Sequence, residues 1–259
     1  WTGLLETDGS SSRTYLLSMA MGNPLEPGTY YVGFYNSSAS TMTSCSFSSH
    51  AVGFGAGVSY PVTLVNFTNG SATAANVEPR GTVYFAVDVP SNQPSWKVRL
   101  ENSSGDNGLY IRKGLIPTFG YPWMGAARSA EREIARLTRN GDESYLLMPD
   151  SGQSTLSAGR YYLMTVGEGL NPVGSRIGTN TSSAVVRSQG NVPVTNLGAL
   201  PVAGALQRDD SYAGGENKLY TFTLPAGVLA LEMRLLNRVG SPSMAVRTDT
   251  LWAGLSGAY

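Results

Sequence analysis

Apolar and polar residues alternate along several short segments of the chain, and turn-forming residues follow each of them. Thr82–Val89 alternates and ends at Pro90, and residues 96–100 (Trp-Lys-Val-Arg-Leu) place Trp, Val and Leu on one face. A period of two is typical of strands with one buried face. Residues 29–35 and 160–166 are apolar at consecutive positions, which indicates central strands covered on both faces. The pattern therefore predicts an all-β protein with two packed layers.

The sequence also repeats itself, in units of about 130 residues. The recurring segments are, in order, YLL at 15 and 145, PGTYYV at 27 and AGRYYL at 158, PVT at 61 and 193, VYFAVDVP at 83 and LYTFTLP at 219, and LYIR at 109 with AVR at 245. Trp1, Trp123 and Trp252, each followed two positions later by Gly, mark three successive starts. Because the pairs keep one order and a nearly constant spacing, the chain contains two copies of one unit.

One segment departs from the strand pattern. Residues 126–139 (AARSAEREIARLTR) are rich in helix formers, whereas their counterpart, residues 4–13, is shorter and rich in Gly and Ser. We interpret residues 126–139 as an insertion with one helical turn that leads into a strand. Residues 229–235 follow the second copy of the alternating strand and are predicted to form a strand as well.

Composition narrows the range of functions. The chain has 18 basic and 18 acidic residues, whereas charge-driven binding to nucleic acids or membrane surfaces needs a basic excess. No apolar run approaches the ~20 residues of a membrane-spanning helix. Cys45 and His50 are the single cysteine and the single histidine, so neither an intrachain disulfide nor a Cys/His zinc site can form. A nucleophile-and-base mechanism would depend on His50 alone, and we expect no catalytic residues.

The order of the motifs resembles that of the bacterial pre-peptidase C-terminal domain family. The family pattern is a Pro-Val-x-x-Leu opening, an aromatic strand ending in Val-Pro, a Gly-Asp-x-Asp-Leu-Tyr-Val-Arg turn and strand with a downstream Pro-Thr, an Asn-Asp-Glu turn, and a final Pro-Gly-Thr-Tyr-Tyr-Val strand. The matching segments here are residues 61–64, 84–90, 105–114 with 117–118, 141–144 and 159–163, and residues 27–32 nearly copy the final motif. The resemblance covers almost the whole chain.

This resemblance implies tandem jelly-roll-like β-sandwich domains without catalytic activity. Such domains occur at the ends of secreted bacterial peptidases and as repeats in large cell-surface proteins. In some relatives the domain binds calcium or helps to bind a polymeric substrate. The expected location is therefore secreted or on the cell surface.

The family frame divides the chain into one complete unit and two halves. Residues 58–190 form the complete sandwich, residues 1–57 the C-terminal half of a unit, and residues 191–259 the N-terminal half of another. Half a sandwich of roughly 60 residues cannot cover its own apolar face and exposes unpaired strand edges. We expect the two halves to combine, more readily between chains than within one; the rival explanation is an excerpt from a longer array.

Asp106 is the candidate metal ligand, because the resemblance places the first acidic residue of a calcium-linked turn there. Calcium sites need several oxygen ligands, usually including more than one carboxylate. The second acidic position of the pattern is Gly108 here, and the second unit has Ser241 where the first has Asp106. A plain Gly/Asp/Asn turn is therefore favoured over a calcium site, and no other cofactor is expected.

The remaining candidates have simpler interpretations. Acidic residues could supply a glycosidase-type carboxylate pair, but they lie in turns and are expected to be solvated. Tryptophans at the unit starts, with two neighbours, could stack on sugars, but repeated positions favour repeated packing. The acidic residues are Asp8, Asp142, Glu143, Asp209 and Asp210, and the aromatic group is Trp1, Trp123 and Trp252 with Tyr121 and Pro122.

Two functions remain open. The first is a non-catalytic structural or adhesive module of a cell-surface array or extracellular filament, assembled by strand complementation between units. Its partners would be neighbouring copies of the same repeat or subunit. The second is an accessory module of a secreted peptidase or other hydrolase, which would present an aromatic face to a protein or polysaccharide.

Overall fold

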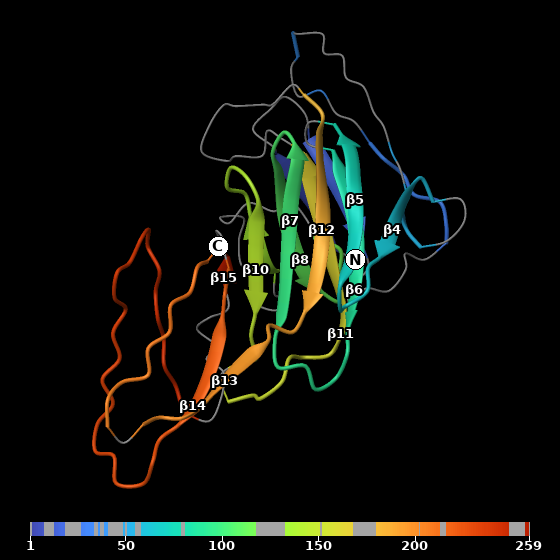
Figure 1. Cartoon of the computed structure of the whole chain (residues 1–259). Coiled ribbons are helices and arrows are strands. Elements are labelled where there is room, and N and C mark those ends of the chain that lie inside the picture. The colour runs from blue at the N-terminus through green and yellow to red at the C-terminus, as the bar shows by residue number, and fades with distance from the viewer. Residues whose placement is uncertain are drawn as a thin grey trace.

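The computed structural model describes residues 2–7, 13–18, 27–33, 36, 39–40, 49, 51–54, 58–78, 81–117, 133–150, 152–167, 180–201, 203–212, 216–248 and 257–258. Within these ranges the protein is built from strands and contains no helix, which confirms the predicted all-β class (Figure 1). The strands are β1 (Thr2–Thr7), β2 (Arg13–Ser18), β3 (Val52–Gly53), β4 (Tyr60–Leu64), β5 (Gly70–Val77), β6 (Thr82–Val89), β7 (Trp96–Ser104), β8 (Asn107–Lys113), β9 (Glu133–Leu137), β10 (Glu143–Leu147), β11 (Gly159–Gly167), β12 (Ser182–Gly190), β13 (Val194–Ala199), β14 (Leu219–Thr223) and β15 (Gly257–Ala258). None of the described residues belongs to a helix that could cross a membrane.

Two sheets form a sandwich. One has the strand order β15-β10-β7-β12-β5, and the other has the order β3-β4-β6-β11-β8-β9. Strands β4 to β12 all lie between residues 58 and 190, and only the short edge strands β3 and β15 come from outside that range. Figure 1 shows β7, β10 and β12 in front of β8 and β11, so the two layers face each other.

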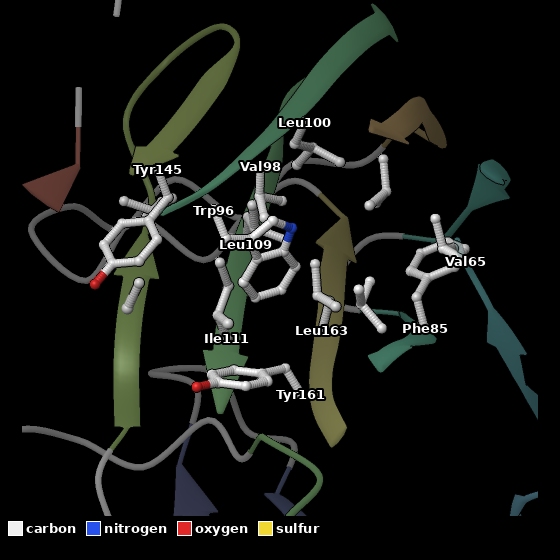
Figure 2. Close-up of a cluster of buried hydrophobic side chains, with 14 of the residues drawn as sticks. Val65, Phe85, Trp96, Val98, Leu100, Leu109, Ile111, Tyr145, Tyr161 and Leu163 are labelled. Atoms are coloured by element: carbon white, nitrogen blue, oxygen red, sulfur yellow. The ribbon is translucent and has the colours of Figure 1, made fainter. Parts of the chain in front are cut away.

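The core lies between the sheets, where aromatic and branched side chains meet. The indole of Trp96 contacts the ring of Tyr161 edge to face, with ring centroids 5.2 Å apart. Leu109, Ile111 and Leu163 complete the centre of this cluster (Figure 2). The Trp96 indole N–H donates to Ser188 Oγ at 2.8 Å, so the one polar atom of the ring is satisfied inside the core.

The Tyr-Tyr segment of the complete unit is a central strand, as predicted. β11 lies between β6 and β8, and it pairs with both in antiparallel orientation. Tyr161 points into the core between the sheets, whereas Tyr162 belongs to a second buried cluster on the outer face. Val52 and Ile116 pack against that outer cluster, which explains why the segment is apolar at consecutive positions.

The strand that was predicted to follow the insertion is present. β9 pairs with β8 in antiparallel orientation, and it forms one edge of the six-stranded sheet. Ala135 and Leu137 are buried and contribute to the core between the sheets. The helical turn was predicted within residues 126–139, and residues 126–132, which precede β9, lie outside the described residues.

The two ends of the chain differ from the strand prediction. Residues 27–33 and residues 224–248 contain no strand, although both stretches carry the apolar pattern of strands in the complete unit. A strand needs a neighbour for its backbone N–H and C=O groups. At the N-terminal end β1 and β2 pair with each other. At the other end residues 224–248 extend away from the two sheets, and β15 returns to pair with β10 (Figure 1).

The C-terminal segment nevertheless begins as the complete unit does. β13 pairs in parallel with β14, just as β4 pairs in parallel with β6. Leu219 and Val192 pack on Leu146 and Met148 of the complete unit, which anchors the start of this segment to the five-stranded sheet. The second copy of the unit therefore begins with the same parallel strand pair, but residues 224–248, which follow β14, form no strand.

Candidate functional site

The two parallel pairs show which residues of the units correspond. Val62 lies opposite Tyr84 in β4 and β6, and Val194 lies opposite Leu219 in β13 and β14. Leu219 is therefore the counterpart of Tyr84, one position along from the match with Val83 that the sequence motifs indicate. The same spacing assigns core positions Trp96, Val98, Leu100 and Ile111 to Leu231, Met233, Leu235 and Val246.

These corresponding positions differ sharply in burial. Val98, Leu100 and Ile111 are fully buried in the complete unit. Met233 is 39% exposed, although Val98 at the same position is 0% exposed, and Leu235 and Val246 are exposed as well. The C-terminal segment thus carries the inward-facing residues of a sandwich core, and the single chain leaves them in water.

The N-terminal segment shows the complementary contrast. Tyr31 is 93% exposed, whereas its counterpart Tyr162 is 8% exposed, and Tyr30 and Val32 are exposed too. In the complete unit this segment is the central strand β11. We call residues 28–33 the donor segment and residues 219–248 the open half unit. Among the described residues, no strand pairing joins the two.

A second candidate site lies where two turns of the complete unit meet. The backbone N–H of Gly141 donates to Asp106 Oδ1 at 2.9 Å, which joins the β7–β8 turn to the β9–β10 turn. The N–H of Asn102 donates to Asp142 Oδ1 at 2.8 Å, and the Asn102 amide donates to the Gly141 carbonyl at 2.6 Å. Asn107 donates to Asn102 Oδ1 at 2.7 Å. The carboxylates act here as acceptors that hold the two turns together.

Glu143 departs from the prediction that it is a solvated turn residue. It is 1% exposed, and its Oε1 accepts the backbone N–H of Arg139 at 2.6 Å. Burial raises the pKa of Glu143 to about 7, and the nearby Asp106 and Asp142 carboxylates raise it further while the hydrogen bond opposes them. The alternation of β10 could have predicted this burial, because Glu143 shares a face with the core residue Tyr145.

The acidic turns do not form a recognisable metal centre. Among the described residues, no group of three or more His, Cys, Asp or Glu side chains is placed to hold an ion. Gly108 stands where the resemblance expects a second carboxylate, and a Cβ there would come within 3.1 Å of the Leu137 carbonyl oxygen. The approach of β9 therefore favours glycine at this position, and the described geometry fits a turn better than a calcium site.

Asp209 and Asp210, the other acidic candidates among the described residues, make separate hydrogen bonds. Asp210 accepts the Tyr220 hydroxyl at 2.6 Å and the Arg208 Nε–H at 2.6 Å. These bonds, with Arg208 first, lower the pKa of Asp210 to about 2. Its neighbour Asp209 accepts only a long bond from Gln207 at 3.4 Å. The hydrogen bonds of Asp210 therefore tie the loop before β14 to Tyr220 of β14.

Several candidates from the sequence cannot be placed. They lie outside the described residues, and they are Asp8, Cys45, His50, Tyr121, Pro122, Trp1, Trp123 and Trp252.

Comparison with known proteins gives likeness of fold only. No family model matches the chain, and no curated protein matches its sequence. The pre-peptidase C-terminal domain of a collagenase from Bacillus anthracis matches with 9% identity and a TM-score of 0.28, over 50% of this chain and 95% of that chain. The chain is thus similar, over half its length, to a member of the family that its motifs resemble.

Two further structures match to a similar extent. PliG of Aeromonas hydrophila, a periplasmic inhibitor of g-type lysozyme, has 13% identity and a TM-score of 0.27, over 49% of this chain and 97% of that chain. CorA of Methylomicrobium album BG8, a surface-associated copper-binding protein, has 10% identity and a TM-score of 0.24, over 50% of this chain and 98% of that chain. At these TM-scores the matches carry no functional argument for this chain.

Proposed function

We propose that this chain is a non-catalytic structural or adhesive module of a secreted or cell-surface array or filament, in which incomplete sandwich units complete one another. The observation that carries the proposal is the contrast between units. Positions that are buried in the complete unit are exposed in the donor segment and in the open half unit. Residues patterned for a core but left in water are typical of a binding surface.

The energetics favour completion of the open half unit. Full burial of a Leu, Met or Phe side chain contributes roughly 1.5–3 kcal/mol. The open half unit exposes Leu231, Met233, Leu235 and Val246, and the donor segment adds two tyrosines and a valine. Strand pairing would also satisfy backbone groups that an open edge leaves to water. Leu231 and Met233 are 39% exposed and Leu235 is 42% exposed, so each would gain only part of the full burial value on completion.

The accessory-module alternative receives less support from the described residues. It requires an aromatic face that is open to a polymer. Tyr84, Tyr110 and Tyr162 do point away from the core on one face of the six-stranded sheet, but all three are buried. Among the described aromatic residues, Tyr30 and Tyr31 are exposed in the donor segment, and Phe54, Tyr60 and Tyr212 are exposed outside both the donor segment and the open half unit.

Sedimentation velocity over a range of concentrations tests the proposal. We expect the 259-residue chain to associate as its concentration rises. Met233→Asp should abolish association, because position 233 corresponds to the core residue Val98. The control is Val239→Asp, which replaces an exposed apolar residue at the position of Ser104, the exposed last residue of β7. A chain that stays monomeric at all concentrations, or equal effects of the two variants, would contradict the proposal.

A further inference from the structure

We infer that the donor segment of a second copy of this chain inserts into the open half unit, between β14 and residues 244–247. This inference rests on the proposed function and specifies its partner, its location and its register. The complete unit contains the same arrangement of strands within one chain, because β11 lies there between β6 and β8.

The complete unit defines the place of the inserted strand. β11 lies between β6 and β8, and it is antiparallel to both. The open half unit contains the counterpart of β6, which is β14, and the counterpart of residues 109–112 of β8, which is residues 244–247. The donor segment is the second copy of the Gly-x-Tyr-Tyr segment that forms β11 in the complete unit, and its residues are exposed.

The register follows from the same correspondence. Tyr161, Tyr162 and Leu163 lie opposite Val87, Ala86 and Phe85 in the complete unit. The equivalent pairs are Tyr30 with Phe222, Tyr31 with Thr221, and Val32 with Tyr220. This register turns Tyr30 and Phe222 toward Met233 and Leu235, which would form the new core. Tyr31 and Thr221 would face outward, as Tyr162 and Ala86 do.

The pair beside this core provides an independent check on the match. In the complete unit Arg160 lies opposite Asp88, and the guanidinium binds the carboxylate through two hydrogen bonds of 2.7 Å. The donor segment has Thr29 in place of Arg160, and β14 has Thr223 in place of Asp88. Both charges are therefore replaced together, and a Thr–Thr pair is a favourable cross-strand neighbour. A mixed pair would have left one charge without its partner.

The insertion joins unlike surfaces of two copies. The donor segment of one chain fills the open half unit of the next, whose own donor segment can in turn bind a further copy. Such a heterologous contact extends into an open filament unless its rotation closes a ring. The open half unit thus binds one strand of a neighbouring copy, and the register of the paired side chains determines which segment it binds.

Disulfide trapping tests both the partner and the register. Starting from Cys45→Ser, the variants Tyr31→Cys and Thr221→Cys are prepared as separate chains and mixed under mild oxidation. Directly opposite residues of an antiparallel pair have Cα atoms about 4.5–5.5 Å apart, which a disulfide spans. We expect heterodimers of the two variants to predominate. Thr223→Cys is the matched control, because it faces the same way but lies diagonally across, about 7–8 Å from position 31.

Each outcome decides a separate claim. Heterodimers with Thr221→Cys that greatly exceed those with Thr223→Cys support the inference. Homodimers of Tyr31→Cys alone, or a crosslink inside one chain carrying both cysteines, overturn it. Association in the ultracentrifuge without the heterodimer overturns the strand and register while leaving the proposed function intact. The absence of any association removes the proposed function, and the inference with it.

Discussion

Tyr161 shows how one residue joins the two layers of the complete unit. Its ring contacts Trp96, and its hydroxyl donates to the Ser157 carbonyl at 2.6 Å. Burial, with the nearby Asp150 carboxylate, raises the pKa of the tyrosine to about 12, so the hydroxyl stays protonated and able to donate. The side chain therefore supplies core volume and a satisfied polar end at once.

Replacing Tyr161 with Ala should lower the free energy of unfolding by about 3–5 kcal/mol, the range for the loss of a core aromatic residue. Tyr31→Ala, in the exposed counterpart segment, should change it by less than ~0.5 kcal/mol when measured at low concentration. Urea unfolding of both variants gives the comparison. A loss below about 1 kcal/mol for Tyr161→Ala would show that the ring does not support the core.

Glu143 should make stability depend on pH. Its pKa is raised from 4.5 to about 7 in the folded protein, so the folded state binds the proton more tightly than the unfolded chain does. Stability is therefore highest below the unfolded pKa and falls as the pH rises through about 7. Glu143→Gln keeps the acceptor for the Arg139 N–H and removes the charge.

We expect Glu143→Gln to be more stable than the wild type at pH 8, by on the order of 1–3 kcal/mol, with little difference near pH 4. The exposed Glu78→Gln serves as the control for the loss of one surface carboxylate. Urea unfolding across this pH range measures both. A Glu143→Gln profile that runs parallel to that of the wild type would contradict the buried-carboxyl account.

At the scale of strands, the sequence pattern was sufficient where both neighbours of a strand are present. The alternation of β6 and β7 and the two apolar faces of β11 predicted their places correctly, because burial on one face or two leaves a direct mark on the sequence. The strand predicted over residues 229–235 is absent. Its residues have the right pattern, but a pattern cannot supply the neighbouring strand that would pair with it.

The candidate sites were predictable to a similar degree. Asp106 and Asp142 were correctly placed in turns, and the hydrogen bonds between the turns could not be foreseen because they join segments far apart in the sequence. Glu143 was wrongly expected in water, since its place near a turn hid its register in β10. The sequence motifs matched Leu219 to Val83, and only the pairing of β13 with β14 showed that its counterpart is Tyr84.

Calcium should add little to the stability of the acidic turns. Asp106, Asp142 and Glu143 each already accept a backbone N–H, and Gly108 supplies no carboxylate. Thermal melts in millimolar calcium and in chelator should therefore coincide. A ligand present at 100 times its dissociation constant would add about 2.7 kcal/mol to the free energy of unfolding. A calcium-dependent rise in Tm that corresponds to this free energy would show that the turns do bind the ion.

At the scale of the whole molecule, the chain combines one sandwich with two segments, residues 28–33 and 219–248, whose apolar residues are largely exposed. The finished unit holds its core between two sheets, while the donor segment and the open half unit carry matching residues in exposed positions. Repeats whose units interact with their neighbours gain stability from each added interface. Stability of the end segments should therefore depend on concentration, and stability of the complete unit should not.

Amide hydrogen exchange at low and high protein concentration tests this central claim most directly. Backbone amides of residues 28–33 and 244–247, which belong to no strand in the single chain, should exchange quickly in the monomer and become protected as the concentration rises. Amides of β6 and β11 should be equally protected at both concentrations, because their strands are already paired. Protection that appears in the donor segment and the open half unit together is the predicted result. Exchange in these segments that stays fast at every concentration would contradict the account.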